Sequence, residues 1–308
     1  MPLLRSILLA TSRNRRLRFF AEHSALGARL SARFVAGMEI EDALRVAQER
    51  NAQGMAVTLD SLGERVRSEA EAQGAAETYH RLLDAIAERQ LNANISVKPT
   101  QMGLGISVGL TESILSALTA HAAQVGNFVR VDMEDSTTTE ATLALVRKLH
   151  ARPELKDAIG VVIQAYLYRS ESDLIQLLQE GVRVRLCKGA YLEPASVAFQ
   201  HKTEVDTNYV KLSCMLLSSG LYPGLATHDT VMIRIAKDYA KRFDIPPERF
   251  EFQMLYGVRR ELQADLVHEG FRVRVYTPFG RAWYPYFIRR LAERPANLLF
   301  LAKNYLRD

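Results

Sequence analysis

The chain has 308 residues, of which 48% are hydrophobic and 24% are charged, as is typical of a soluble globular protein that buries a large core. Its formal net charge of +5 is too mild for this length to indicate nucleic-acid binding by itself. No uninterrupted apolar run approaches the roughly 18 residues that a membrane-spanning helix needs, and the apolar N-terminus, broken by Arg5, matches a signal peptide poorly.

The first part of the chain is predicted to be helical. Its expected helices cover residues 2–14, 17–33 and 39–53. Glu39 and Asp42 place acidic side chains at the start of the third helix, where they suit the helix dipole. We expect residues 1–54 to form a helical arm on a catalytic domain that covers residues 55–308.

From residue 55 onward, short β-rich runs alternate with helical patterns. The expected strands are residues 56–59, 94–97, 128–133, 161–166, 182–187, 225–227, 250–254 and 271–276. The expected helices are residues 68–90, 111–124, 138–150, 171–180, 204–218, 230–243 and 261–269, with a last helix from Pro285. Strands joined through helices pair in parallel, and eight such units close naturally into a (β/α)8 barrel. A doubly wound open sheet is the alternative, although it usually has fewer strands.

Polar residues gather at the predicted C-terminal ends of these strands, where barrels of this kind carry their chemistry. They are Asp60, Lys98, Asp132, Glu134, Asp135, Gln164, Arg185, Lys188, His228, Gln253 and Tyr276. A desolvated lysine at a barrel end, Lys98 or Lys188, could form a Schiff base as in lysine-dependent aldolases. An inward-facing Arg185 needs an anionic or strongly accepting partner, because an unpaired buried charge is costly, and a cofactor is a good candidate.

Other interpretations of these residues stay open. Asp132, Glu134 and Asp135 either cap the following helix or, with His228, bind a divalent cation, although no second histidine lies nearby in the sequence. The arginines of residues 13–18 favour a solvated helix face over contact with lipid or nucleic acid. The sequence has neither a dinucleotide fingerprint nor a Walker phosphate loop, so barrel loops must hold any nucleotide cofactor.

The predicted last helix carries a polar stripe. Tyr286, Arg289, Arg290 and Glu293 are spaced i, i+3, i+4 and i+7, so they share one helix face. Arginine pairs are well suited to a bidentate grip on a carboxylate or phosphate. The stripe is therefore either an anion clamp or a solvated, salt-bridged face.

Taken together, the motifs resemble those of the proline dehydrogenase family, in its short monofunctional bacterial form. In chain order they are Leu59-Asp-Ser-Leu-Gly-Glu64, Ile95-Ser-Val-Lys-Pro99, Val131-Asp-Met-Glu134, Gln164-Ala-Tyr166, Arg185-Leu-Cys-Lys-Gly-Ala-Tyr191, Ala226-Thr-His228, Phe250-Glu-Phe-Gln-Met-Leu255 and Tyr286-Phe-Ile-Arg-Arg290. The resemblance covers approximately residues 55–300. It implies a distorted (β/α)8 barrel that uses FAD to oxidise L-proline to Δ1-pyrroline-5-carboxylate, the first step of proline catabolism, and passes electrons to a membrane quinone.

The resemblance also implies roles for individual residues. Arg289 and Arg290 would hold the proline carboxylate with Lys98, and Asp132 would be the charge partner of Lys98. The residues implied around the proline ring are Ala190, Leu255, Tyr276 and Tyr286. The residues implied at the flavin are Met133, Gln164, Arg185, Cys187, Lys188, Gly189, Thr227 and His228. Glu64 would act as a gate that pairs with Arg289 when the site is closed.

Two features bear on these implications. Leu192 stands where many relatives carry Trp, which puts the cofactor packing at that position in question, and the segment from Tyr276 to Tyr286 is shorter than in bifunctional relatives. Cys187 and Cys214 lack disulfide-like or metal-like spacing, which predicts a reducing compartment. We expect a cytoplasmic protein that does not bind nucleic acid, with peripheral contact to the inner face of the cell membrane left open.

Overall fold

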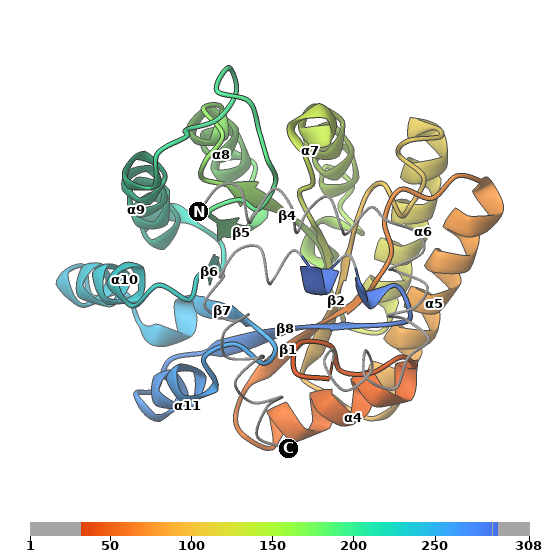
Figure 1. Ribbon diagram of the computed structural model, residues 1–308, viewed down its shortest axis with the longest axis horizontal. Coiled ribbons are helices and arrows are strands. Elements are labelled where there is room, and N and C mark those ends of the chain that lie inside the picture. The colour runs from red at the N-terminus through yellow and green to blue at the C-terminus, as the bar shows by residue number, and fades with distance from the viewer. Residues whose placement is uncertain (1–31, 285, 289–308) are drawn as a thin grey trace.

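The computed structural model describes residues 32–284 and 286–288, and within them parallel strands close into a barrel inside a ring of helices (Figure 1). The strands are β1 (Ala56–Ser61), β2 (Ala93–Val97), β3 (Val129–Val131), β4 (Ile159–Gln164), β5 (Arg183–Cys187), β6 (Gly224–Ala226), β7 (Glu251–Leu255) and β8 (Val273–Phe279). Each strand pairs with the next in sequence, and β1 also pairs with β8, with Val57 opposite Val275. The predicted (β/α)8 barrel is confirmed, with strand boundaries shifted by a few residues.

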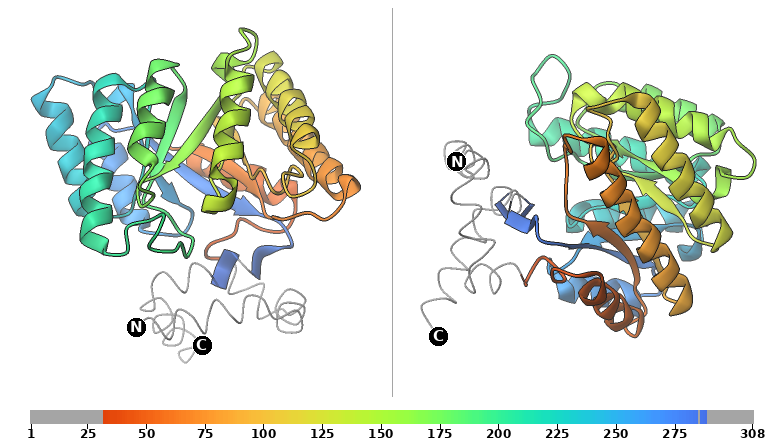
Figure 2. Two further views of the ribbon diagram at one scale, coloured as in Figure 1. Left: turned by 90° about the horizontal axis from the view of Figure 1, so that it is seen from above. Right: turned by 90° about the vertical axis from the view of Figure 1, so that its right-hand side faces the viewer.

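Helices connect the strands and pack around the outside of the barrel (Figure 2). They are α5 (Glu69–Glu88), α6 (Val108–Gln124), α7 (Ser136–His150), α8 (Ser170–Gln179), α9 (Lys202–Ser219), α10 (Thr230–Arg242) and α11 (Arg260–His268), with short 3-10 turns η1 (Lys156–Ala158) and η2 (Pro247–Arg249). Side-chain caps fix several of their starts. Ser68, Asp135 and Asp229 each accept a hydrogen bond from a backbone N–H in the first turn of the following helix.

The segment before the barrel supplies a further helix of the ring. Helix α4 (Ile40–Asn51) packs against β1 and β8 and lies between α11 and α5 in Figure 1. Its buried face is made of Ala43, Leu44, Val46 and Ala47. The helix expected over residues 39–53 is thus present. The helix expected over residues 2–14 lies outside the described residues, and the one expected over 17–33 is a turn at its two described positions.

The core of the molecule lies between the strands and the helices, because side chains alternate across each strand. On β1 and β2, the buried apolar residues Val57, Leu59, Ile95 and Val97 belong to this outer layer. The alternate positions are polar, buried and turned into the barrel: Thr58, Asp60, Asn94, Ser96 and Lys98. Hydrogen bonds across the lumen confirm this orientation, such as the 2.9 Å bond from Nη1 of Arg274 on β8 to Oδ1 of Asn94 on β2.

A smaller apolar cluster sits beside the C-terminal end of the barrel. Phe34 and Val35 pack there with Leu62, which follows β1, and with Trp283 and Phe287. The last helix, expected from Pro285, is described only at residues 286–288, which are helical together with residues 283–284. None of the helices in the described ranges combines the length and apolar composition needed to cross a membrane.

Candidate active site

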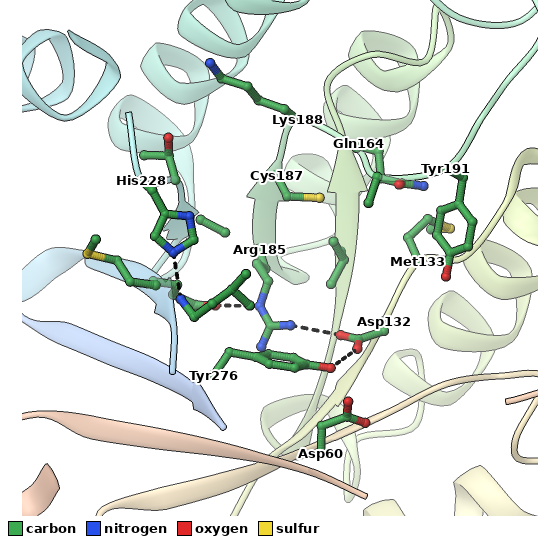
Figure 3. A pocket seen from close by; sticks show the side chains of 18 of the residues that line it. Asp60, Asp132, Met133, Gln164, Arg185, Cys187, Lys188, Tyr191, His228 and Tyr276 are labelled. Atoms are coloured by element: carbon green, nitrogen blue, oxygen red, sulfur yellow. Dashed lines mark hydrogen bonds and ion pairs between the residues drawn. The ribbon is translucent and has the colours of Figure 1, made fainter. Parts of the chain in front are cut away.

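A cavity of about 450 Å³ opens where the strands end, at the C-terminal mouth of the barrel. Figure 3 shows its side chains converging from several strands. Most of the site residues expected from the sequence line it: Lys98, Asp132, Met133, Gln164, Arg185, Cys187, Lys188, Gly189, Ala190, Thr227, His228, Leu255, Tyr276 and Tyr286. Residues that are more than 180 positions apart in sequence therefore share one site, because every strand of a parallel barrel ends at the same mouth.

Asp132, just after β3, is the centre of the polar network in this cavity. Its Oδ1 accepts hydrogen bonds from Ser96 Oγ at 2.6 Å and from Arg185 Nη1 at 2.8 Å. Its Oδ2 accepts one from the Tyr276 hydroxyl at 2.7 Å (Figure 3). Both oxygens are thus held by donors from β2, β5 and β8, which fixes the orientation of the carboxylate.

Lys98 has a closer anionic partner than the expected Asp132. Its ammonium donates to both oxygens of Asp60, at 2.7 and 2.8 Å, whereas the nearest Asp132 oxygen is 3.8 Å away. Burial alone would lower the pKa of Lys98, but the charges of Asp60 and Asp132 outweigh it and raise that pKa above its ordinary value. Lys98 is therefore a fixed, buried cation at the floor of the cavity.

Arg185 on β5 also finds its partners within the protein. Besides Asp132, its guanidinium donates through Nε to Oε1 of Gln253 on β7 and lies 5.2 Å from the ring centroid of Tyr276. We expected a buried Arg185 to need an anionic or strongly accepting partner, and Asp132 is an anionic partner within the protein. Gln253, which lies on the cavity wall, orients the guanidinium and was not among the expected site residues.

Tyr276 is held as a hydrogen-bond donor. Burial, followed by the neighbouring charges of Asp132 and Asp60, raises the pKa of its hydroxyl well above the ordinary value. The phenol therefore keeps its proton at neutral pH, and its hydroxyl donates a hydrogen bond to Asp132. It supplies a rigid wall of the cavity and cannot serve as a base there.

A second group of residues follows β5 and β6. The ammonium of Lys188 contacts Asp206 at 2.5 Å and Asp229 at 3.1 Å. Gly189 has φ +116°, and a Cβ there would lie 2.4 Å from the ring of Tyr166, so only glycine lets the backbone pass so closely. His228 accepts a hydrogen bond at Nε2 from the backbone N–H of Leu255, which ties the end of β6 to the end of β7.

The acidic run after β3 divides into three separate roles. Asp132 faces the cavity, Asp135 caps α7, and Glu134 accepts hydrogen bonds from the backbone N–H and hydroxyl of Thr100. Burial raises the pKa of Glu134, although the bonds from Thr100 oppose that effect. No cluster of three metal-binding side chains occurs in the described ranges, so the alternative of a divalent-cation site gains no support.

Three expected residues are not placed on the cavity wall. Arg289 and Arg290 lie outside the described residues. Glu64 is partly buried on the segment after β1 and is not a lining residue, and its expected partner Arg289 is not described. Conversely, Asp60 and Gln253 belong to the network although neither was assigned a role. Their signal in the sequence is polarity at strand positions that should face the barrel interior.

Comparison with known proteins agrees with this geometry. A sequence model of the family described as proline dehydrogenase matches residues 43–303. Proline dehydrogenase 1 of Bacillus subtilis is 43% identical over 306 residues, which cover 99% of this chain and 100% of that protein. The proline dehydrogenase of Deinococcus radiodurans is 40% identical over 283 residues, 90% of each chain.

The chain belongs to the proline dehydrogenase family. Among solved structures, proline utilization A from Bdellovibrio bacteriovorus superposes with a TM-score of 0.80 at 26% identity, over 93% of this chain and 38% of that one. The Bradyrhizobium japonicum protein superposes with a TM-score of 0.75 at 27% identity, over 87% of this chain and 31% of that one. This family member thus spans well under half the length of those two chains, while it matches the Bacillus subtilis protein end to end.

The ion pair of Lys98 with Asp60 generates a stability prediction. Asp60→Ala should lower the free energy of unfolding by about 3–5 kcal/mol, because it leaves Lys98 buried without its closest counter-charge. Denaturant unfolding of the purified variants measures this. Lys98→Met combined with Asp60→Asn removes both charges and should recover part of the loss. The exposed Glu49→Ala, which breaks the surface pair with Arg45, serves as the control and should change stability little. Equal losses in the Asp60 and Glu49 variants would contradict the assignment.

Proposed function

We propose that this protein oxidises L-proline to Δ1-pyrroline-5-carboxylate, with FAD as the first electron acceptor and a membrane quinone as the next. The observation that carries the proposal is the pairing of a fixed cation, Lys98, with the Arg185–Asp132–Tyr276 network inside one cavity of the barrel. Membership in the proline dehydrogenase family supports the choice of substrate.

The donor set of the cavity fits a flavin. A flavin ring is flat and apolar on its faces and accepts hydrogen bonds along one edge. The cavity offers the Arg185 guanidinium, the Gln164 amide and the ammonium of Lys188 beside apolar residues such as Met133. Gly189 lines the cavity, and its backbone runs so close to the Tyr166 ring that no side chain fits between them. We assign cofactor contact to Met133, Gln164, Arg185, Cys187, Lys188, Gly189, Thr227 and His228.

Bound FAD would take up the hydride from the proline ring carbon next to nitrogen, which none of the twenty side chains can do. The protein's own residues orient the substrate. Lys98 attracts the proline carboxylate from the floor of the cavity, and we assign the bidentate grip to Arg289 and Arg290. Ala190, Leu255, Tyr276 and Tyr286 bound the space around the ring, and Glu64 is assigned the role of a gate. Asp132 accepts hydrogen bonds from Arg185 and Tyr276, which holds both side chains in place, and its negative charge offsets that of the Arg185 guanidinium.

The first test is the visible absorption spectrum of the purified protein, before and after anaerobic addition of L-proline. We expect a flavin band that bleaches when proline is added. A flavin band that does not respond to proline would remove the substrate and leave the cofactor. A colourless protein that stays inactive after addition of FAD would overturn the proposal.

The network also predicts the pH dependence. Proline must react with its nitrogen unprotonated. The Tyr276 hydroxyl cannot take that proton, because its raised pKa keeps it protonated, and both oxygens of Asp132 already accept hydrogen bonds. We therefore expect the substrate amine to release its proton to solvent. We expect kcat/KM for proline to rise by about tenfold per pH unit below the amine pKa. Steady-state kinetics across the neutral range would refute this if the profile were flat while chemistry limits the rate.

The clamp assignment predicts a separation of substrate binding from cofactor binding. Arg289→Ala or Arg290→Ala should raise the KM for proline by at least about tenfold, as expected for loss of a charge-assisted hydrogen bond, while FAD stays bound. Arg281→Gln is the matched control and should leave KM unchanged. Arg281 is an exposed arginine that precedes the clamp residues by a few positions and pairs with Glu39. An unchanged KM in both clamp variants would remove these residues from the site.

The structure gives no support to the Schiff-base alternative. A lysine nucleophile must be deprotonated, yet Lys98 is paired with Asp60 and its pKa is raised, and Lys188 is paired with two carboxylates. Borohydride trapping in the presence of substrate distinguishes the two chemistries. The arginines of residues 13–18, on which a lipid- or nucleic-acid-binding role would rest, lie outside the described residues.

A further inference from the structure

The interior charges of the barrel balance at one end and not at the other. At the C-terminal mouth, Lys98 and Arg185 face Asp60 and Asp132. At the opposite end, where the strands begin, the described interior side chains include three arginines, Arg130, Arg183 and Arg274, and a single carboxylate, Glu251. We call this end the N-terminal mouth. It carries two guanidinium charges more than carboxylate charges.

Glu251 is already committed to one arginine. Its Oε1 accepts from Arg274 Nε at 2.7 Å and from Gln253 Nε2 at 2.5 Å, and its Oε2 accepts from the Tyr222 hydroxyl at 3.1 Å. Burial raises the pKa of Glu251, but the charge and hydrogen bonds of Arg274 outweigh this and hold that pKa below the ordinary value. Glu251 thus accepts its hydrogen bonds from Arg274, Gln253 and Tyr222, and it reaches Arg183 and Arg130 only through its charge.

Arg130 on β3 is buried, and its guanidinium lies 4.8 Å from the centroid of the Phe128 ring. Its Nη1 donates to the backbone oxygens of Val161 and Arg183, at 3.0 and 2.6 Å, while its Nε has no partner among the described residues. Burial and the charges of Arg185 and Arg183 depress its pKa. An arginine keeps its proton at neutral pH, so the repulsion between Arg130 and its neighbouring arginines persists. A bound anion would reduce that repulsion.

Arg183, the first residue of β5, is partly buried. Its guanidinium contacts two aromatic rings, 4.2 Å from the centroid of Phe128 and 5.2 Å from that of Tyr222. Within the described part of the chain it makes no side-chain hydrogen bond or ion pair, and its Nε is buried without a partner. Stacking fixes the plane of the guanidinium and leaves its N–H edge for another ligand.

Two hollows at the N-terminal mouth meet at this arginine. Both are lined by Arg183 and Arg274, together with Asn92 and Asp157. Arg272 stands on the rim of the second hollow and donates to the Tyr222 hydroxyl. A small molecule entering either hollow therefore reaches the open edge of Arg183 from solvent, at the end of the barrel opposite the proposed proline site.

We propose that the N-terminal mouth binds a doubly charged oxyanion, of which phosphate is the type, on the stacked guanidinium of Arg183. Two negative charges match the excess of two guanidiniums, and the fork of an arginine pairs with two oxygens of a phosphate. Asp157 on the rim opposes the anion and keeps the site from binding it very tightly. This inference is independent of the proline dehydrogenase activity, because none of its residues lines the catalytic cavity.

The test is thermal unfolding of the full-length protein in increasing sodium phosphate, with ionic strength held constant by sodium chloride. We expect Tm to rise with the logarithm of the phosphate concentration once it exceeds the Kd, by about 5 °C at one hundred times the Kd. Arg183→Gln should abolish the rise. Arg45→Gln, a change at an exposed arginine of α4, is the matched control and should retain it. Phosphate bound at the proline clamp instead would stabilise the Arg183 variant and the parent equally, which would overturn the proposal.

A second variant keeps the test decisive if Arg183→Gln fails to fold. Asp157→Asn removes an exposed carboxylate and should lower the phosphate Kd fitted to the Tm data about threefold, since a like charge near the anion is lost. An unchanged Kd, or no rise in Tm in the parent protein, would contradict the site. Glycerol phosphate in place of phosphate separates the two sources of the ligand: a similar Kd indicates a phosphorylated metabolite, and no effect indicates the free ion.

Discussion

The cavity at the C-terminal mouth of this barrel depends on one carboxylate. Asp132 accepts hydrogen bonds from Ser96 on β2, Arg185 on β5 and Tyr276 on β8, so it joins strands that are not neighbours in the sheet. The backbone ladder fixes only adjacent strands, and this cross-lumen anchor fixes the opposite walls. Arg185 and Tyr276 take their positions from this carboxylate, and hydrogen bonds to an ionic group in a buried site are strong.

The architecture could be predicted from the sequence, because short β-rich runs alternate with helical patterns through eight units. Polar residues at the predicted strand ends indicated the mouth of the barrel at which the cavity lies. The sequence did not predict which of these side chains pair. The ammonium of Lys98 lies 2.7 Å from Asp60 and 3.8 Å from Asp132. Which carboxylate is nearer depends on the stagger of the strands around the barrel, and no sequence motif encodes that stagger. The roles of Asp60 and Gln253 were missed for the same reason, although both positions were visibly polar. Similarly, the separation of Asp135 as a helix cap from Asp132 as a site residue rests on where β3 ends.

The two mouths of the barrel solve the problem of buried charge differently. At the C-terminal mouth, the described cations Lys98 and Arg185 each have a carboxylate partner, so an incoming anion must compete with Asp60 for Lys98. At the N-terminal mouth, aromatic faces and backbone carbonyls substitute for counter-ions. Such partners spread a positive charge without cancelling it, and they leave the N–H edges of the arginines available. A polar chain through Arg185, Gln253 and Glu251 links the two ends.

The position of α4 has a consequence for how the chain folds. This helix covers β1 and β8 at once, and β1 itself pairs with β8, so the earliest described elements find their partners more than 200 residues later. Contacts of such long sequence separation form slowly, because the loop entropy must be lost before they are gained. During synthesis the apolar face of α4 and one edge of β1 stay without their β8 partner until β8 has left the ribosome. Until then an unpaired strand edge is exposed, and such edges favour aggregation. Closing the barrel is therefore also the step that ends this vulnerable period.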